Sequence, residues 1–142
     1  MMDTELKREI ILDNYKYPTN KDGNDDLGYE KINSNNESCI DDIDLFINID
    51  NNVIEDIRFN GEACAVSTAS TSIMIKNIIG KTIEEAYKYI NNFDNMVNEL
   101  EYDSELLGEA IAFDEIYKQQ NRKGCVTLPY VAIKKILDKY KN

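Results

Sequence analysis

Histidine and tryptophan are absent from this 142-residue sequence, and proline occurs only twice. Histidine is the side chain that most often serves as general base near neutral pH, and it is also the commonest metal ligand. Without it, the chain cannot by itself supply the Ser-His-Asp or Cys-His arrangement of a nucleophilic hydrolase. The absence therefore excludes a large class of enzyme mechanisms.

Basic residues are few compared with acidic ones. The chain has 16 Lys and Arg against 27 Asp and Glu, which gives a net charge of −11 and an isoelectric point near 4.4. No basic stripe is available to neutralise phosphates, so nucleic acid is excluded as a partner. The same charge disfavours binding to anionic membrane surfaces. It is compatible with docking onto a basic protein surface, although solubility alone explains it equally well.

Long apolar runs are also missing. None approaches the roughly 20 residues that span a bilayer, and the first residues lack a basic-then-apolar signal pattern. Three cysteines, an odd number, fit reduced thiols better than a disulfide framework. We therefore expect a cytoplasmic protein with no membrane partner, folded as a single domain over residues 1–142.

Residues 30–61 have the pattern of an antiparallel sheet of about three strands. Between 43 and 49 apolar residues alternate with polar ones, apart from Phe46, and Val53 to Phe59 forms a second apolar run. Asp50, Asn51 and Asn52 separate the two runs with typical turn residues. A short strand near residues 30–33 adds an edge.

Helical patterns surround this sheet and predict an α+β fold. A first amphipathic helix is expected at 3–15, with Leu6, Ile10 and Ile11 facing inward. A second, apolar nearly all round, is expected at about 65–78 and should be buried against the sheet. The remaining expectations are an exposed loop at 18–29, a helix opened by a capping box of Thr82 and Glu85, one short helix within 98–121, and a last helix at about 127–140.

The chemistry of the sequence depends on its cysteines. Cys64 follows Gly61 and precedes the apolar helix, so it is expected in or just before a first helical turn, where free N–H groups favour an anion. Cys125 is expected in the same position relative to the last helix, with Pro129 in that helix's first turn. Cys39 lies in the loop that enters the hairpin.

The topology favours convergence of these residues. Adjacent antiparallel strands bring the Cys39 loop and Cys64 to one edge of the sheet. Cys125 and Asp41 would complete a set of three sulfurs and one oxygen, the number of ligands in a tetrahedral zinc site. An Fe–S cluster on the same ligands remains an alternative, although four thiolates are the usual set. Because no C-x-x-C pair is present, simple burial of the cysteines stays open as well.

Polar neighbours are interpreted as structural. Asp42 is expected as an exposed strand residue rather than a ligand. The hydroxyl run at positions 67–72 has no base to activate it, so we interpret it as a helix cap and small packing residues.

Five segments together resemble a known family. They are Y-K-Y-P-T-N at 15–20, N-E-S-C-I-D at 36–41, F-N-G-E-A-C-A-V-S-T-A-S at 59–70, G-K-T-I-E-E-A at 80–86 and R-K-G-C-V-T-L at 122–128. In this order they resemble the motifs HYKNPRN, NPxCGD, FxGxGCxISxAS, GKTxEEA and RxKCATL of the NifU N-terminal/IscU family of iron–sulfur assembly proteins. Gly124 stands where the IscU type has histidine. Arg122 and the long stretch 98–121 before the last cysteine resemble the SufU type.

The resemblance implies a site and an activity. By resemblance, Cys39, Asp41, Cys64 and Cys125 bind Zn²⁺, and Cys39 accepts sulfur as a persulfide from a cysteine desulfurase. Arg122 is interpreted either as a partner of the thiolates just outside the ligands or as a solvated loop charge. The protein would then be a sulfur carrier that acts with the desulfurase rather than a stand-alone enzyme, and would serve downstream cluster assembly or recipient proteins.

Two alternatives and two departures accompany this interpretation. The same ligands would hold a transient [2Fe–2S] cluster or iron in a scaffold of the IscU type, and a structural zinc would suit an interaction module.

Ile40 replaces the family's glycine after the first cysteine, and Glu37 replaces its proline. A β-branched residue at 40 would restrict the backbone there and limit how far Cys39 can move toward a partner.

Overall fold

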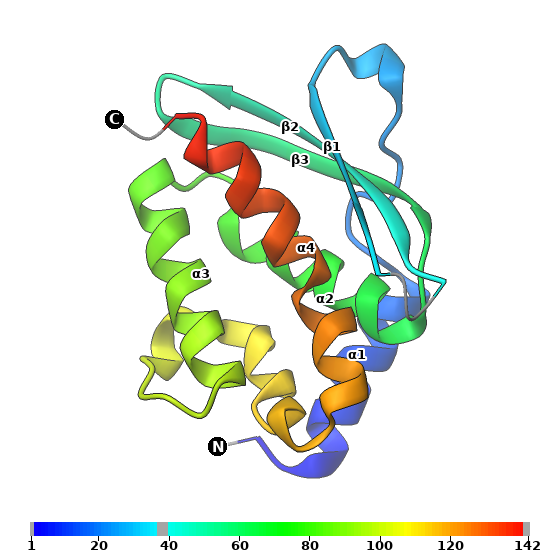
Figure 1. The fold of residues 1–142 in the computed structure, drawn as a ribbon, viewed down its shortest axis with the longest axis vertical. Helices are drawn as coiled ribbons and strands as arrows, with labels where there is room; N and C mark the ends of the chain where they lie inside the picture. The colour runs from blue at the N-terminus through cyan, green and yellow to red at the C-terminus, as the bar shows by residue number, and fades with distance from the viewer. Residues whose placement is uncertain (1, 37–39, 141–142) are drawn as a thin grey trace.

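The structure, a computed structural model, describes residues 2–36 and 40–140. Figure 1 shows three strands along one side of the molecule and helices packed against one another on the other side. In chain order the elements are α1 (Thr4–Lys16), η1 (Asp25–Leu27), β1 (Glu30–Asn35), β2 (Asp42–Asp50), β3 (Val53–Glu62), α2 (Ala65–Ile78), α3 (Ile83–Val97), η2 (Ser104–Leu106), η3 (Gly108–Phe113), η4 (Ile116–Lys118) and α4 (Gln120–Asp138), where η marks a 3₁₀-helix.

The sheet confirms the predicted hairpin and edge strand. Its order is β1-β2-β3 with both pairs antiparallel, and Leu45 lies opposite Phe59 in the register. Asn51 and Asn52 both have positive φ, at 54° and 66°, as a tight hairpin turn requires, and asparagine tolerates that conformation best after glycine. The predicted α+β class is therefore confirmed.

Helix α2 lies at the centre of the fold. Its residues Ile73, Met74 and Ile75 are fully buried, as its uniformly apolar or small sequence predicted. It packs between α1 and α4 as well as against β3, so its burial comes from helices as much as from the sheet. Next along the chain, the capping box of Thr82 and Glu85 opens α3 as expected.

Helix α1 forms as expected, but its predicted inward face is only partly confirmed. Asp3 caps it by accepting a hydrogen bond from the Leu6 N–H at 2.8 Å. Ile10 and Ile11 pack against the core, but the prediction for Leu6 was wrong, since 43% of that residue is exposed. Lys7 is the neighbour that turns inward, because its ammonium meets the Asp114 carboxylate at 2.6 Å.

The last third of the chain required two corrections. Residues 98–121 hold three short 3₁₀-helices where one short helix was expected. Helix α4 begins at Gln120, seven residues earlier than the expected start at Thr127. Cys125 therefore lies within α4 rather than before it, and Pro129 lies in the helix interior rather than in its first turn.

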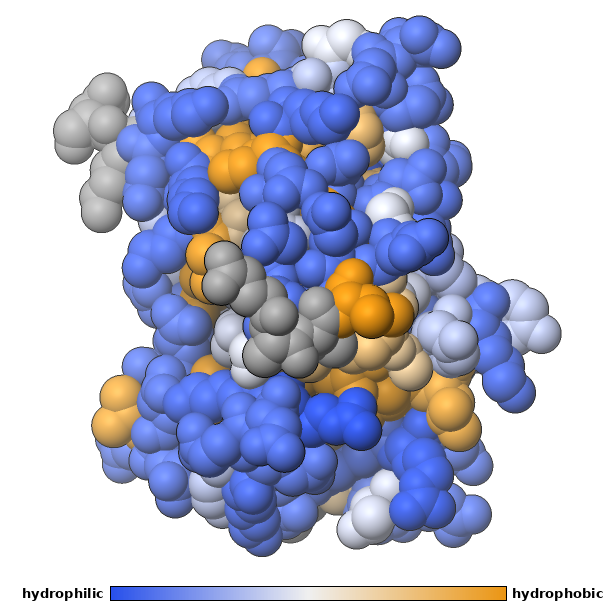
Figure 2. All heavy atoms as spheres, turned by 45° about the vertical axis from the view of Figure 1, so that its right-hand side comes forward, coloured by the Kyte–Doolittle hydropathy of each residue, from blue (hydrophilic) through white to orange (hydrophobic). Residues whose placement is uncertain are grey.

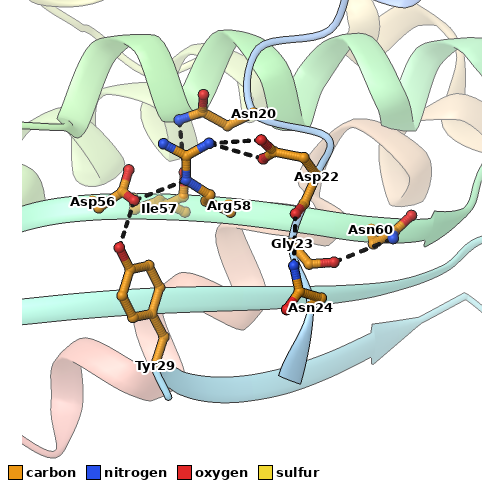
Figure 3. A network of polar contacts seen from close by, with 9 residues as sticks. All are labelled: Asn20, Asp22, Gly23, Asn24, Tyr29, Asp56, Ile57, Arg58 and Asn60. Atoms are coloured by element: carbon orange, nitrogen blue, oxygen red, sulfur yellow. Dashed lines mark hydrogen bonds and ion pairs between the residues drawn. The ribbon is translucent and has the colours of Figure 1, made fainter. Parts of the chain in front are cut away.

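Within the loop at 18–29, residues 20–23 lie beside the outer edge of β3, and the chain then crosses the sheet toward β1 (Figure 3). The Phe59 N–H donates to Asn20 C=O and the Gly23 N–H donates to Phe59 C=O, each at 2.9 Å. Arg58 on β3 holds the same loop by a bidentate pair with Asp22 at 2.8 and 2.9 Å. The loop thus covers a strand edge that would otherwise be open to pairing. Among the described helices, none is both long and apolar enough to cross a membrane.

Candidate metal centre

Three separated parts of the chain deliver sulfur and oxygen donors to one place. Asp41 immediately precedes β2, Cys64 follows β3, and Cys125 lies in the second turn of α4. One carboxylate oxygen and the two sulfurs all lie within 4.8 Å of one another. Asp41 is only 1% exposed, so this is a donor group built into the interior.

Asp41 is held as an anion by its hydrogen bonds. The Cys64 backbone N–H donates to Asp41 Oδ1 at 2.7 Å, and Ser67 Oγ makes a short contact with Oδ2. Burial alone would raise the pKa of Asp41, but the bonds from Ser67 and Cys64 outweigh it and lower the pKa below its ordinary value. A buried, charged carboxylate is the form in which aspartate binds metals.

Cys64 is the N-cap of α2, as the sequence predicted. Its Sγ accepts the Ser67 backbone N–H at 3.4 Å and lies 3.8 Å from Asp41 Oδ2. The sulfur thus occupies the place where a helix start presents unpaired donors. The bond from the Ser67 N–H fixes the orientation of the Cys64 side chain, so that its sulfur faces Asp41.

Cys125 lies one turn before the proline within α4. Pro129 has no N–H to donate to the carbonyl four residues earlier, which is that of Cys125. Ser67 Oγ lies 2.9 Å from this carbonyl, and Ser70 Oγ lies 2.6 Å from the next one, Val126 C=O. The Ser70 hydroxyl thus donates to a carbonyl of α4, and the single proton of the Ser67 hydroxyl is shared between Asp41 Oδ2 and the Cys125 carbonyl, which places Asp41 and Cys125 on the same hydroxyl.

The electrostatics of the three donors favour a cation. Burial raises the pKa of the Cys125 thiol to about 12, and the hydrogen bond with Asp41 and the proximity of Cys64 add to the rise. Anionic donors so close together repel one another in the interior. A divalent cation between them would attract these anionic groups, lower the pKa of the Cys125 thiol and favour its thiolate form.

Ser67 and Asn36 are site residues that the sequence analysis missed. Ser67 contacts all three donor residues, through its N–H to Cys64 and its hydroxyl to Asp41 and the Cys125 carbonyl. The only sequence signal was its position three residues after Cys64, where an N-capped helix directs its amide back at the cap. Asn36 donates from Nδ2 to Cys125 Sγ at 3.8 Å. A Cβ at position 124 would lie 3.2 Å from that nitrogen, which gives Gly124 a packing reason.

The other predicted residues are placed as follows. Cys39, the predicted sulfur acceptor and fourth ligand, lies outside the described residues, as does Glu37. Arg122 is exposed on the first turn of α4 and makes no hydrogen bond to Asp41, Cys64 or Cys125 within the described ranges. Asp42 is exposed at the start of β2, as expected. Ile40 is 70% exposed beside the buried Asp41.

The donor set fits zinc. Zn²⁺ binds both cysteine sulfur and carboxylate oxygen, usually four ligands in a tetrahedral arrangement, with bond lengths of about 2.0–2.3 Å. Such lengths place neighbouring ligand atoms about 3.5–3.8 Å apart, and Cys64 Sγ lies 3.8 Å from Asp41 Oδ2. Asp41, Cys64 and Cys125 would be three of the ligands, and the residue for a fourth must come from elsewhere.

Comparison with known proteins agrees with this geometry. Over 132 residues the chain is 38% identical to the zinc-dependent sulfurtransferase SufU of Bacillus subtilis, covering 92% of this chain and 88% of the relative. It is 36% identical over 138 residues to the iron–sulfur cluster assembly scaffold protein IscU of Streptococcus pyogenes, covering 96% and 86%.

A solved structure and a family profile complete the comparison. The crystal structure of a protein named for iron–sulfur cluster assembly in the SUF system of Fervidobacterium islandicum has a TM-score of 0.85 and 34% identity, covering 91% of this chain and 94% of that one. The profile of the NifU-like N-terminal domain matches residues 6–142. The chain belongs to the NifU-like N-terminal domain family.

Proposed function

We propose that this protein is an iron–sulfur cluster assembly protein that accepts sulfur, as a persulfide, from a cysteine desulfurase. The observation that carries the proposal is the set of buried Asp41, half-buried Cys64 and buried Cys125, whose ligand atoms lie within 4.8 Å of one another. The likeness to a relative named as a zinc-dependent sulfurtransferase supports the same activity. In this proposal Zn²⁺ is held by these three residues together with Cys39.

The proposed step is a thiol–persulfide exchange. The Cys39 thiolate attacks the outer sulfur of the persulfide on the desulfurase, and a new S–S bond forms on Cys39. The S–S bond of the donor breaks at the same time, and the donor cysteine leaves as a thiolate. One S–S bond replaces another, so the step needs no oxidant or reductant.

The residues around Cys39 in the sequence suit this step. Zinc, when bound, would keep the cysteine sulfurs ionised and oriented. Asp41, fixed by the Cys64 N–H and by Ser67, would hold its place while a sulfur next to it exchanges partners. The Asn36 N–H donates to Asp41 C=O at 3.0 Å, which joins the described ends of the segment that carries Cys39.

A second candidate function is a scaffold on which a [2Fe–2S] cluster is assembled and then passed on. The observation that favours it is the likeness to relatives named as IscU scaffold proteins, and two cysteine sulfurs at one centre would bind iron as well. Gly124, in place of the histidine of the IscU type, removes a ligand that such a scaffold would use. We therefore place the sulfur-acceptor function first.

Metal and persulfide analysis tests the proposal directly. The protein is mixed anaerobically with a cysteine desulfurase and cysteine, and intact mass, zinc, iron and acid-labile sulfide are measured. We expect one zinc per chain and a cysteine-dependent gain of one sulfur on Cys39. Cys39→Ala should abolish that gain, whereas Asp42→Ala, which changes an exposed carboxylate next to a proposed ligand, should keep it.

Two other results would overturn the sulfur-acceptor function. Stable iron and acid-labile sulfide without persulfide turnover would move the protein to the scaffold class. Zinc with neither sulfur gain nor cluster would leave a structural site. Full stimulation of the desulfurase by Cys39→Ala would exclude Cys39 as the acceptor.

A further inference from the structure

A groove of about 390 Å³ opens beside the candidate metal centre, between α1, the start of α2, the 3₁₀ segments and the start of α4. One of its walls begins at Val66, two residues beyond Cys64, and another holds Arg122, three residues before Cys125. Figure 2 views the face on which α1 and the start of α2 lie, and apolar side chains gather there between strongly hydrophilic ones.

The floor of the groove is apolar. Phe113 and Ile116 are buried beneath it, Ile11 and Val66 are half-buried, and Leu12 is 44% exposed along the rim. An apolar floor that is partly open to water gains free energy when another apolar side chain covers it.

The rim carries positive charge on an otherwise acidic molecule. The chain has only three arginines, and Arg58 is paired with Asp22 and Asp56 on β3. The other two, Arg8 and Arg122, both line this groove, and neither forms an ion pair within residues 2–36 and 40–140. The chain has 27 acidic residues, yet none of the described ones forms an ion pair with Arg8 or Arg122. Both guanidinium groups are therefore available to carboxylates of a partner.

The remaining charges of the groove are already balanced. Lys7 is paired with Asp114 at 2.6 Å, and Glu115, the one carboxylate in the lining, lies 3.6 Å from the ammonium of Lys118. Arg8 and Arg122 are thus the unbalanced charges of the groove. Arginine binds carboxylates through two parallel hydrogen bonds, which gives direction as well as attraction.

We propose that this groove binds an acidic segment of a protein partner, with an apolar side chain on the floor formed by Ile11, Val66, Phe113 and Ile116 and carboxylates on Arg8 and Arg122. The charge of the groove selects such a segment, because a basic or neutral one would leave both guanidinium groups without a partner. Seated there, the segment would lie alongside the metal centre without occupying it. The proposal concerns docking alone and does not depend on sulfur transfer.

Peptide titration of the full-length, zinc-loaded chain tests it. The probe is an acetylated and amidated hexapeptide of alternating aspartate and leucine, and the observable is the set of backbone amide shifts in ¹⁵N-labelled protein. We expect saturable shifts at Ile11, Val66 and Gln119. Two control peptides separate the contributions, one with serine in place of leucine and one with lysine in place of aspartate, and each should bind at least about tenfold more weakly.

Charge reversal on the protein gives the matched control. The double variant Arg8→Glu and Arg122→Glu should weaken binding of the aspartate–leucine peptide by about tenfold or more. Lys88→Glu, a single charge reversal of an exposed lysine on α3, should leave it within about twofold. Both arginines are exposed and unpaired among the described residues, so circular dichroism should show the double variant folded.

Two results would overturn the inference. One is the absence of saturable shifts in the groove with the aspartate–leucine peptide. The other is binding that the double arginine variant leaves unchanged. Neither result bears on persulfide formation at Cys39, so failure of this inference and failure of the proposed function are distinguishable.

Discussion

Two polar clusters lie in this molecule, and they differ in how their charges are balanced. On β3, Arg58 stands between two carboxylates, with its Nε 2.9 Å from Asp56 Oδ2 and its Nη1 2.8 Å from Asp22 Oδ2 (Figure 3). At the candidate metal centre, the Asp41 carboxylate lies beside Cys64 and Cys125, and no ion pair with a lysine or arginine of residues 2–36 and 40–140 involves it. The Arg58 cluster contains both the cation and its carboxylate counter-ions. The Asp41 cluster contains potential metal ligands but no cationic side chain of the described residues.

The difference separates a structural network from a ligand site. A charge network that contains its own counter-ions fixes backbone segments, here the loop at 20–23 on β3. At the candidate metal centre the Asp41 carboxylate is stabilised, within the described part of the chain, by hydrogen bonds alone, beside one half-buried and one buried cysteine, and a bound cation would supply the missing positive charge. The lack of a cationic partner for Asp41 among the described residues, rather than its burial, therefore makes this cluster the candidate ligand site.

Removal of the Asp41 carboxylate should have the largest effect on metal binding. Asp41→Ala is expected to lower zinc affinity by more than about a hundredfold, because it removes a proposed ligand and the acceptor of the Cys64 N–H. Competition with a chelating dye measures the affinity. A chelator should lower the melting temperature of the zinc-loaded wild type but not that of the variant, since only the former has bound metal to lose.

Asp42→Ala is the control for that experiment. The same side chain is removed one position away, where it is exposed at the start of β2. Zinc affinity close to that of the wild type is expected. An equal loss in both variants would show that the net charge, not the position of Asp41, determines binding.

Deletion of the hydroxyl that fixes Asp41 should have the next largest effect. Ser67→Ala removes the contacts to Asp41 Oδ2 and to the Cys125 carbonyl but keeps the N–H to Cys64 Sγ. Outer hydrogen-bond partners of metal ligands are typically worth about 10- to 100-fold in metal affinity, and we expect a loss in that range.

The free energy of unfolding gives a second readout for Ser67. The variant removes the one hydroxyl proton that a buried carboxylate oxygen and a buried carbonyl share, and the loss of this donor should cost about 1–3 kcal/mol. Ser70→Ala is the matched control on the same helix, because Ser70 contacts Val126 C=O and no donor residue. It should lower stability but keep zinc affinity, so equal zinc loss in both variants would contradict a specific role for Ser67.

Loss of the counter-ion from the balanced network should affect stability alone. Arg58→Met is expected to lower the free energy of unfolding by about 1 kcal/mol, because the network is partly exposed and screened. Zinc affinity should not change. Urea denaturation and dye competition on the same sample measure the two quantities.

The pH dependence of stability should report the same network. Burial alone would raise the pKa of Asp56, but the hydrogen bonds from Arg58 and Tyr29 outweigh burial and lower it. A lowered folded-state pKa means that the stabilisation is complete above the unfolded-state value of about 3.9 and is lost as the pH falls through the folded-state value. Arg58→Met should weaken this loss on the acid side, and an unchanged acid profile would contradict the assignment.

The sequence predicted the sheet and the caps because their signals are local. The turn at Asn51 and Asn52, the capping box of Thr82 and Glu85, and the position of Cys64 each depend on residues within one turn. The pairing of charges in the two polar clusters could not be predicted in the same way. Asp22 and Arg58 lie far apart in sequence, and nothing local indicates that they pair.

The start of α4 was missed for a tertiary reason. Gln119 makes no side-chain capping bond, and Gly124 and Pro129 are residues that usually end helices. The helix nevertheless includes both, because Ser67 and Ser70 of α2 reach the carbonyls of Cys125 and Val126. The exposed face of Leu6 has a similar origin, since the place toward the core is taken by the pairing of Lys7 with a carboxylate far along the chain.

The smallest effect is expected from Tyr29→Phe, a change that parallels Ser67→Ala in the other cluster. Each change deletes one hydroxyl next to an aspartate, and the Tyr29 hydroxyl donates to Asp56 Oδ2 at 2.8 Å. Asp56 keeps Arg58 as its partner, so the melting temperature should fall by less than in Arg58→Met, and zinc affinity should not change. Differential scanning calorimetry measures the first quantity and dye competition the second. A loss of zinc affinity in Tyr29→Phe would mean that the two clusters are coupled through β3, and the separation between a balanced structural network and an unbalanced ligand site would no longer hold.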